Sequence, residues 1–180
     1  MVALLEVTIN ALTALVFATA AVGKLRHAET FEGVVANFRI LPEPLVRPFA
    51  RALPWAELAV AVLVWAPGVV GAAAQAAGAA LMVVFAIAMA INVGRGRRII
   101  DCGCFQTEGR QPVGWPMVLR NLVFAGALAL AAGLDGGRLD ALVWSNGLAA
   151  GVALFLLYLA AGELAALRSR VQSKTEGLRA

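Results

Sequence analysis

Residues 53–94 read LPWAELAVAVLVWAPGVVGAAAQAAGAALMVVFAIAMAINVG. This segment is apolar except for Glu57, Gln75 and Asn92. At about 1.5 Å per residue, a helical segment of this length crosses a bilayer core about 30 Å thick twice. Pro67-Gly68 lies within it and predicts the turn of a hairpin. The segment therefore predicts two membrane-spanning helices.

The whole chain has the composition of an integral membrane protein. Hydrophobic residues make up 61% of its 180 residues, charged residues 14%, and the mean hydropathy is +0.82. An ordinary globular domain has about 45–50% apolar and about 25% charged residues. The net charge of +4 comes from Arg and Lys beside apolar segments, which favours a lipid membrane over nucleic acid as the partner. The chain carries no nucleic-acid-binding motif.

Three more apolar segments, residues 4–22, 117–134 and 139–161, are each about as long as a bilayer core requires. They bring the count to five spans, or to four without the hairpin. Gly147 and Gly151 form a GxxxG pair in the last span, a cue for close helix packing. We predict an all-α polytopic membrane helix bundle forming a single domain over residues 1–165, followed by a basic cytoplasmic tail over residues 166–180.

The connection between the first span and the hairpin, residues 23–51, is the longest polar segment. It contains four large apolar side chains with the spacing i, i+3, i+4, i+7, namely Phe31, Val34, Val35 and Phe38. This pattern predicts a short amphipathic helix, which either lies at the membrane interface or packs onto the bundle. Three prolines that follow are expected to break helical structure before the next span: Pro42, Pro44 and Pro48.

The two cysteines of the chain, Cys102 and Cys104, are separated by one glycine on a polar loop between two apolar segments. Two residues span roughly 6–7 Å of extended chain, within the Cα separation of about 4.4–6.8 Å that a disulfide tolerates. The pair can therefore close on itself with strain, and strained disulfides tend to be labile or catalytic. We predict that Cys102 and Cys104 form a redox pair.

Charged neighbours would change how readily these two cysteines form thiolates. Thiolate is the reactive form of cysteine, and nearby positive charge favours it. Arg97, Arg98 and Arg110 would act in this way, whereas Asp101 would oppose thiolate formation or accept a proton. Two other interpretations stay open: an inert pair, or a Cu(I) or Zn site, for which only one histidine remains to complete the ligand shell.

Some polar residues fall at or inside predicted spans. A carboxylate in a membrane is a functional hypothesis by default, and Glu57 has Arg120 or Lys24 as a candidate partner. A structural ion pair is the alternative. Asn92 and Asn121 either form hydrogen bonds across helices or line a quinone pocket. Our candidates for binding such a cofactor are Glu57, Arg120, Asn121 and Lys24.

Several motifs resemble the MauE family of bacterial membrane proteins, part of a wider DoxX-like group. They are the run GKLR at 23–26, PWAEL at 54–58, GRRIIDCGCF at 96–105, VGW at 113–115 and VLRN at 118–121. The cysteine loop is the most specific of them, although Gln106 stands where the family pattern has glycine. The resemblance runs from the first predicted helix to the fourth.

The resemblance implies a role in thiol-disulfide metabolism at the bacterial inner membrane, first recognised through methylamine utilisation. It implies a thioredoxin-fold partner, with which the protein helps to form disulfides in a methylamine dehydrogenase subunit. The function we predict is a thiol-disulfide oxidoreductase component that exchanges disulfides through Cys102 and Cys104. The competing prediction is a non-enzymatic membrane scaffold or maturation factor with inert or metal-binding cysteines.

The basic residues predict the orientation. Residues 23–51, the cluster at 95–98 and the tail are basic, whereas the Pro67-Gly68 turn and the turn at 135–138 carry almost no positive charge. Five spans with the N-terminus outside and the C-terminus inside satisfy the positive-inside rule at every connection. This places the cysteine loop at the cytoplasmic face, although the implied clients are extracytoplasmic. Electrons would then cross the bilayer through a quinone, a movable loop or a partner's cysteines.

Overall fold

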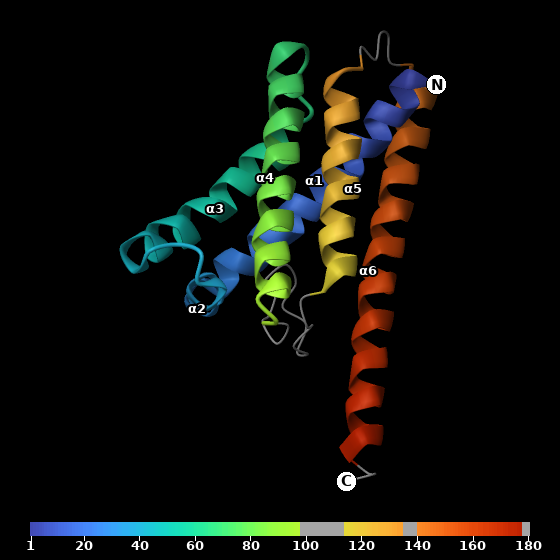
Figure 1. The fold of residues 1–180 in the computed structure, drawn as a ribbon. Helices are drawn as coiled ribbons and strands as arrows, with labels where there is room; N and C mark the ends of the chain where they lie inside the picture. Colours follow the sequence, from blue (N-terminus) through green and yellow to red (C-terminus); the bar gives the residue numbers. More distant parts are fainter. Residues whose placement is uncertain (98–113, 135–139, 178–180) are drawn as a thin grey trace.

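The computed structural model describes residues 1–97, 114–134 and 140–177. These residues form six helices and no strand (Figure 1). The helices are α1 (Val2–Arg26), α2 (Ala28–Phe38), α3 (Glu43–Leu63), α4 (Val69–Gly94), α5 (Trp115–Ala132) and α6 (Ala141–Gly177). The predicted all-α class is confirmed, and α6 continues past residue 166, where the tail was expected to begin.

Four helices are long and apolar enough to span a membrane: α1, α4, α5 and the segment Ala141–Leu164 of α6. The predicted hairpin is also present, because Gly68 lies in the turn between α3 and α4. Its φ of 64° favours a residue without a Cβ. The helix before this turn, α3, is not among the four, since its first half carries Arg47 and Arg51. The described residues thus contain four candidate spans, the lower number of the predicted range of four to five.

The ends of the helices alternate along the bundle (Figure 1). The start of α1, the α3–α4 turn and the end of α5 lie at one end, whereas α2, the end of α4, the start of α5 and the end of α6 lie at the other. This is the alternation that five crossings produce. Orientation relative to a membrane stays a prediction.

The expected break at the prolines is only partly present, because residues 39–42 are not helical but α3 begins at Glu43 and continues through the later prolines. Pro42 caps α3, Pro44 lies in its first turn, and Pro48 and Pro54 lie inside it. A proline fits the first turn because its missing N–H has no helical partner there. Each of the two interior prolines removes one backbone hydrogen bond. Pro54 is itself buried and Pro48 is exposed. Burial of the face of α3 that carries Val46 and other core residues offsets the loss.

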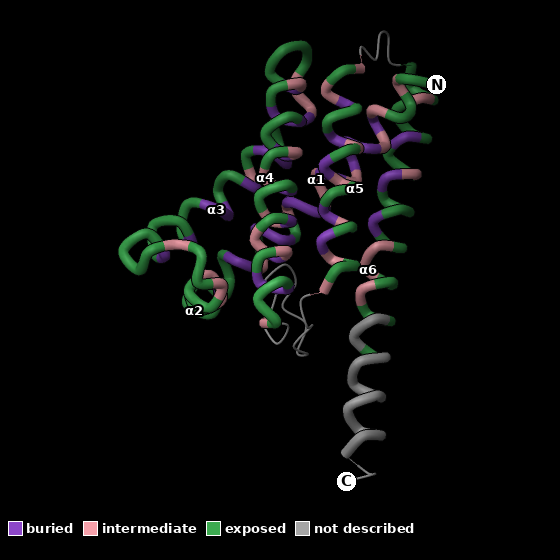
Figure 2. Tube along the Cα trace, viewed as in Figure 1, coloured by how far each residue is buried: buried purple, intermediate pink, exposed green. Residues whose placement is uncertain are grey.

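The amphipathic helix exists as α2, and it packs onto the bundle. Phe31 is buried against Ala50 and Leu53 of α3. Buried residues gather where α1, α3, α4 and α5 face one another, and the outer faces of the helices are exposed (Figure 2). An outer face of this kind is what lipid would cover in a membrane bundle.

The GxxxG pair of α6 packs against α1, as its spacing predicted. A Cβ added at Gly147 would lie 2.6 Å from Cγ1 of Val7, and one added at Gly151 would meet the Cβ of Ala11. Real Cβ atoms do not approach so closely, so larger residues would push the two helices apart. The two glycines therefore set the distance between the first and last helices.

Candidate functional site: a buried ion pair beside an apolar cavity

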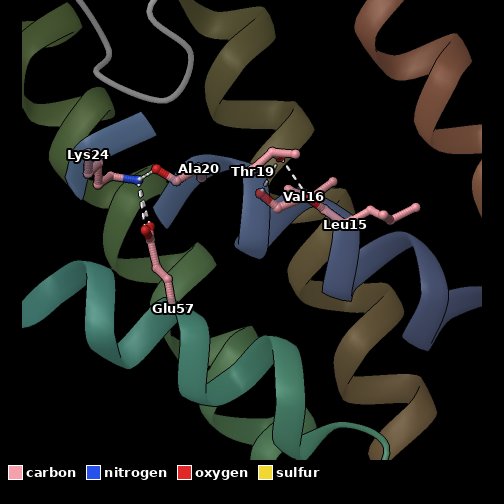
Figure 3. Close-up of polar contacts among 6 residues, drawn as sticks. All are labelled: Leu15, Val16, Thr19, Ala20, Lys24 and Glu57. Atoms are coloured by element: carbon pink, nitrogen blue, oxygen red, sulfur yellow. Dashed lines mark hydrogen bonds and ion pairs between the residues drawn. The ribbon is translucent and has the colours of Figure 1, made fainter. Parts of the chain in front are cut away.

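The centre of the candidate site is an ion pair between α1 and α3. Nζ of Lys24 lies 2.8 Å from Oε1 and 2.9 Å from Oε2 of Glu57 (Figure 3). The two side chains are 5% and 1% exposed. The structure therefore gives Glu57 one of the two partners expected from the sequence. Charges so deeply buried are tolerated only when they compensate each other.

Aromatic rings surround the ammonium group of Lys24. Its Nζ lies 5.4 Å from the ring centre of Phe31 and 6.0 Å from that of Phe85. Both distances allow a cation–π attraction. Beyond the two contacts to Glu57, Nζ has a long contact of 3.5 Å with the carbonyl oxygen of Ala20 (Figure 3). Nζ therefore has one short-range partner, the carboxylate of Glu57, and the other acceptor given for it among the described residues is distant.

A cavity of about 180 Å³ opens beside the ion pair, between α2, α3 and α4. Lys24 contributes the one polar side chain among the described residues that line it. The rest of the wall is aliphatic or aromatic, including four phenylalanines: Phe31, Phe38, Phe49 and Phe85. The arrangement can hold an apolar ring or chain next to a single hydrogen-bond donor.

Asn92 ties α4 to α2. Its Nδ2 donates to the carbonyl oxygens of Phe38 and Ala88, each at 3.1 Å, and Arg97 donates to its Oδ1 at 3.5 Å. Asn92 does not line the cavity. Of the two roles predicted for this residue, the structure supports hydrogen bonding across helices.

Arg120 and Asn121 of α5 lie apart from the cavity, whose walls come from α1 to α4. The guanidinium of Arg120 lies 5.2 Å from the ring centre of Tyr158 on α6. Its Nε and the Nδ2 of Asn121 are buried and have no hydrogen-bond partner among the described residues. The structure therefore places Arg120 against α6, and a cofactor-binding role for either α5 residue stays a prediction.

One buried polar contact was not anticipated. Nε2 of Gln75 on α4 donates to Oδ1 of Asn10 on α1 at 2.8 Å, and both side chains are buried. The available signal was that each residue has an amide side chain inside an apolar span. Such residues need a partner inside a bilayer, but the sequence does not say which residue it is.

The predicted redox residues Cys102, Cys104 and Asp101 lie outside the described residues. The helices that flank them are described: α4 ends at Gly94 and α5 begins at Trp115. Both termini lie at the end of the bundle that also holds α2 (Figure 1). Arg97, the last described residue before the pair, contacts Asn92 at this end.

Fold and composition define a multi-pass helical membrane protein. The chain matches the family described as "Methylamine utilisation protein MauE" over residues 1–134, and it belongs to that family. It is 52% identical over 157 residues to methylamine utilization protein MauE of Paracoccus denitrificans, covering 86% of this chain and 83% of that one.

Two further relatives carry the same name. The chain is 46% identical over 172 residues to the protein of the same name from Paracoccus versutus, covering 93% of this chain and 90% of that one. It is 43% identical over 153 residues to the one from Methylophilus methylotrophus, covering 82% and 79%. No solved structure matches the chain.

Proposed function

We propose that the protein is a thiol-disulfide exchange component of the bacterial inner membrane, in which Cys102 and Cys104 alternate between dithiol and disulfide. A single observation carries this proposal: the two cysteines of the chain stand one residue apart, inside the region that matches the MauE family. The names of its relatives place the process in methylamine utilisation. The partner is a thioredoxin-fold protein, and the outcome is disulfide formation or maturation of an extracytoplasmic protein.

A single exchange balances with the partner alone, and a two-electron acceptor must then restore the Cys102–Cys104 disulfide. A thiolate of the reduced partner attacks one sulfur of the Cys102–Cys104 disulfide, which forms a mixed disulfide and releases the other cysteine as a thiolate. The second thiolate of the partner then attacks the partner sulfur of the mixed disulfide. The partner leaves as a disulfide, and Cys102 and Cys104 are left as a dithiol. Asp101 is placed by sequence to accept a proton in these steps.

The local charge supports this chemistry. Arg95 and Arg97 follow the last turn of α4, just before the stretch that holds the cysteines. Positive charge favours the thiolate form, which is the nucleophile and also the better leaving group. The same basic residues favour a cytoplasmic location for this end of the bundle, with the N-terminus outside and the C-terminus inside.

A trapping experiment tests the proposal. Because the chain has two cysteines, Cys102→Ser and Cys104→Ser each leave a single thiol. One of these variants should accumulate a mixed disulfide with a thioredoxin-fold protein, seen on a non-reducing gel and identified by mass spectrometry. The double variant should form none, and it should leave the partner's redox state as in cells that lack the protein.

The alternative class has its own signature in this experiment. If the double serine variant restores normal partner oxidation in cells that lack the wild-type chain, the cysteines are not redox-active in function. The protein would then be a scaffold or maturation factor. Expression and membrane insertion of each variant, checked by immunoblotting of membrane fractions, keep a folding failure from being read as loss of exchange.

A further inference from the structure

We propose that the cavity between α2, α3 and α4 binds the head group of a membrane quinone, with Lys24 as the residue that recognises it. The electron-accepting role of this quinone rests on the proposed thiol-disulfide function, whereas its binding does not. Three features carry the assignment: the size of the cavity, the chemistry of its wall and the single ammonium group inside it.

The size suits one substituted six-membered ring. The cavity measures about 180 Å³, somewhat more than the engineered apolar cavity of about 150 Å³ that binds benzene. It is open on one side, where Ile40 and Phe49 are more than a third exposed. A ring can therefore enter while an attached isoprenoid chain remains among the lipids.

The wall suits an aromatic or quinonoid ring. Phe31, Phe38, Phe49 and Phe85 line the cavity, and aromatic rings favour offset-stacked or edge-to-face contacts with another ring. A lipid acyl chain would also be accommodated by such a wall. It would gain nothing from the ammonium of Lys24, which therefore favours a ring that carries a hydrogen-bond acceptor.

Lys24 supplies the polar contact that a quinone carbonyl needs. Its ammonium group has three N–H donors, and its acceptors among the described residues are the two carboxylate oxygens of Glu57 at 2.8 and 2.9 Å and the carbonyl oxygen of Ala20 at 3.5 Å. A ligand carbonyl oxygen can accept an N–H bond from Nζ at a shorter distance than Ala20 does. Because Glu57 balances the positive charge, the site presents a donor to a neutral ligand without an excess charge in the membrane.

A quinone also completes the electron balance of the proposed function. Oxidation of the Cys102 and Cys104 dithiol to a disulfide releases two electrons and two protons, and reduction of a quinone to a quinol consumes the same number of each. Met89 lines the cavity and lies five residues before the end of α4, about 8 Å along the helix axis. The site is thus near the helix end that leads to the cysteines.

Quinone binding is testable with the full-length protein in phosphatidylcholine nanodiscs. We expect an azidoquinone to label peptides from α2, α3 or α4 on illumination, and decylubiquinone to compete for this labelling while added phospholipid does not. Val84 lines the cavity and its neighbour Val83 does not. Val84→Phe should lower decylubiquinone affinity roughly tenfold, equivalent to about 1.4 kcal/mol, and Val83→Phe should leave it unchanged.

Two further variants keep the outcome unambiguous. Ala88→Leu fills the same cavity from another position and should weaken binding as Val84→Phe does, with thermal unfolding confirming that both proteins are folded. The Cys102→Ser/Cys104→Ser protein should bind decylubiquinone normally. Labelling confined to other helices, or displacement by phospholipid alone, would overturn the proposal even if partner trapping succeeds. If decylubiquinone binds normally but no mixed disulfide is trapped, the exchange function is overturned and the quinone site is supported.

Discussion

Replacing one member of the Lys24–Glu57 pair should destabilise the bundle far more than replacing both. The side chains are 5% and 1% exposed, and both carboxylate oxygens lie within 2.9 Å of Nζ. Glu57→Leu leaves the ammonium between Phe31 and Phe85 without its counter-charge. Breaking a buried pair in this way costs about 3–5 kcal/mol, whereas replacing both members by apolar residues is about neutral or stabilising by about 1–4 kcal/mol.

Thermal unfolding of four proteins measures this difference. The wild type, Lys24→Met, Glu57→Leu and the double variant are compared in one mild detergent by circular dichroism. For a chain of this length, 1 kcal/mol shifts the midpoint by about 2–4 °C. Each single variant should therefore melt roughly 6–20 °C lower, given a cost of about 3–5 kcal/mol. The double variant should melt near or above the wild type.

Two results would refute the reasoning. Single variants within about 0.5 kcal/mol of the wild type would behave like surface substitutions, which would mean that water reaches the pair. A double variant as unstable as the singles would show that the two charges do not compensate each other. In the second case the stabilising role of Glu57 would lie in other contacts.

Other predictions concern helix packing, the α2–α4 contact and topology. Gly151→Leu should destabilise the protein by about 1–3 kcal/mol, as overpacking does, whereas Gly126→Leu should be tolerated because a side chain there meets open space; thermal unfolding compares the two. Asn92→Ala should speed hydrogen exchange in the last turn of α2, since it removes the donor to Phe38; unchanged exchange would show that this bond does not hold the turn. A membrane-impermeant maleimide should label the reduced cysteine pair in permeabilised but not in intact cells; labelling in intact cells would reverse the proposed orientation.

Much of the fold could be predicted because membrane spans are determined by local composition. The apolar segments, the Pro67-Gly68 turn and the GxxxG spacing are all features of neighbouring residues. The need of Glu57 for a partner also followed from the cost of a lone charge in lipid. Lys24 was one of two candidates, and only the packing of α1 against α3 selected it.

The remaining features depend on contacts between distant segments. Pro48 and Pro54 lie inside α3 because that helix buries one face against its neighbours, a tertiary effect that overrides the local cost of proline. Asn92 donates to a backbone carbonyl of α2. Every residue has such a carbonyl, so the sequence does not indicate which residue accepts the bond. The cavity likewise results from three helices whose apolar residues look like ordinary core residues in the sequence.

The pairing of α1 with α6 also bears on the order in which the bundle is made. A chain enters the membrane from its N-terminus, so α1 is inserted first and α6 last. The face of α1 around Val7 and Ala11 cannot meet Gly147 and Gly151 until these two glycines have been synthesised and inserted. Until then lipid covers that face. Of the six described helices, α6 therefore joins the bundle after the other five. A chain truncated before α6 would leave this face of α1 without the helix that packs on it, while the contact of α1 with α3 would remain.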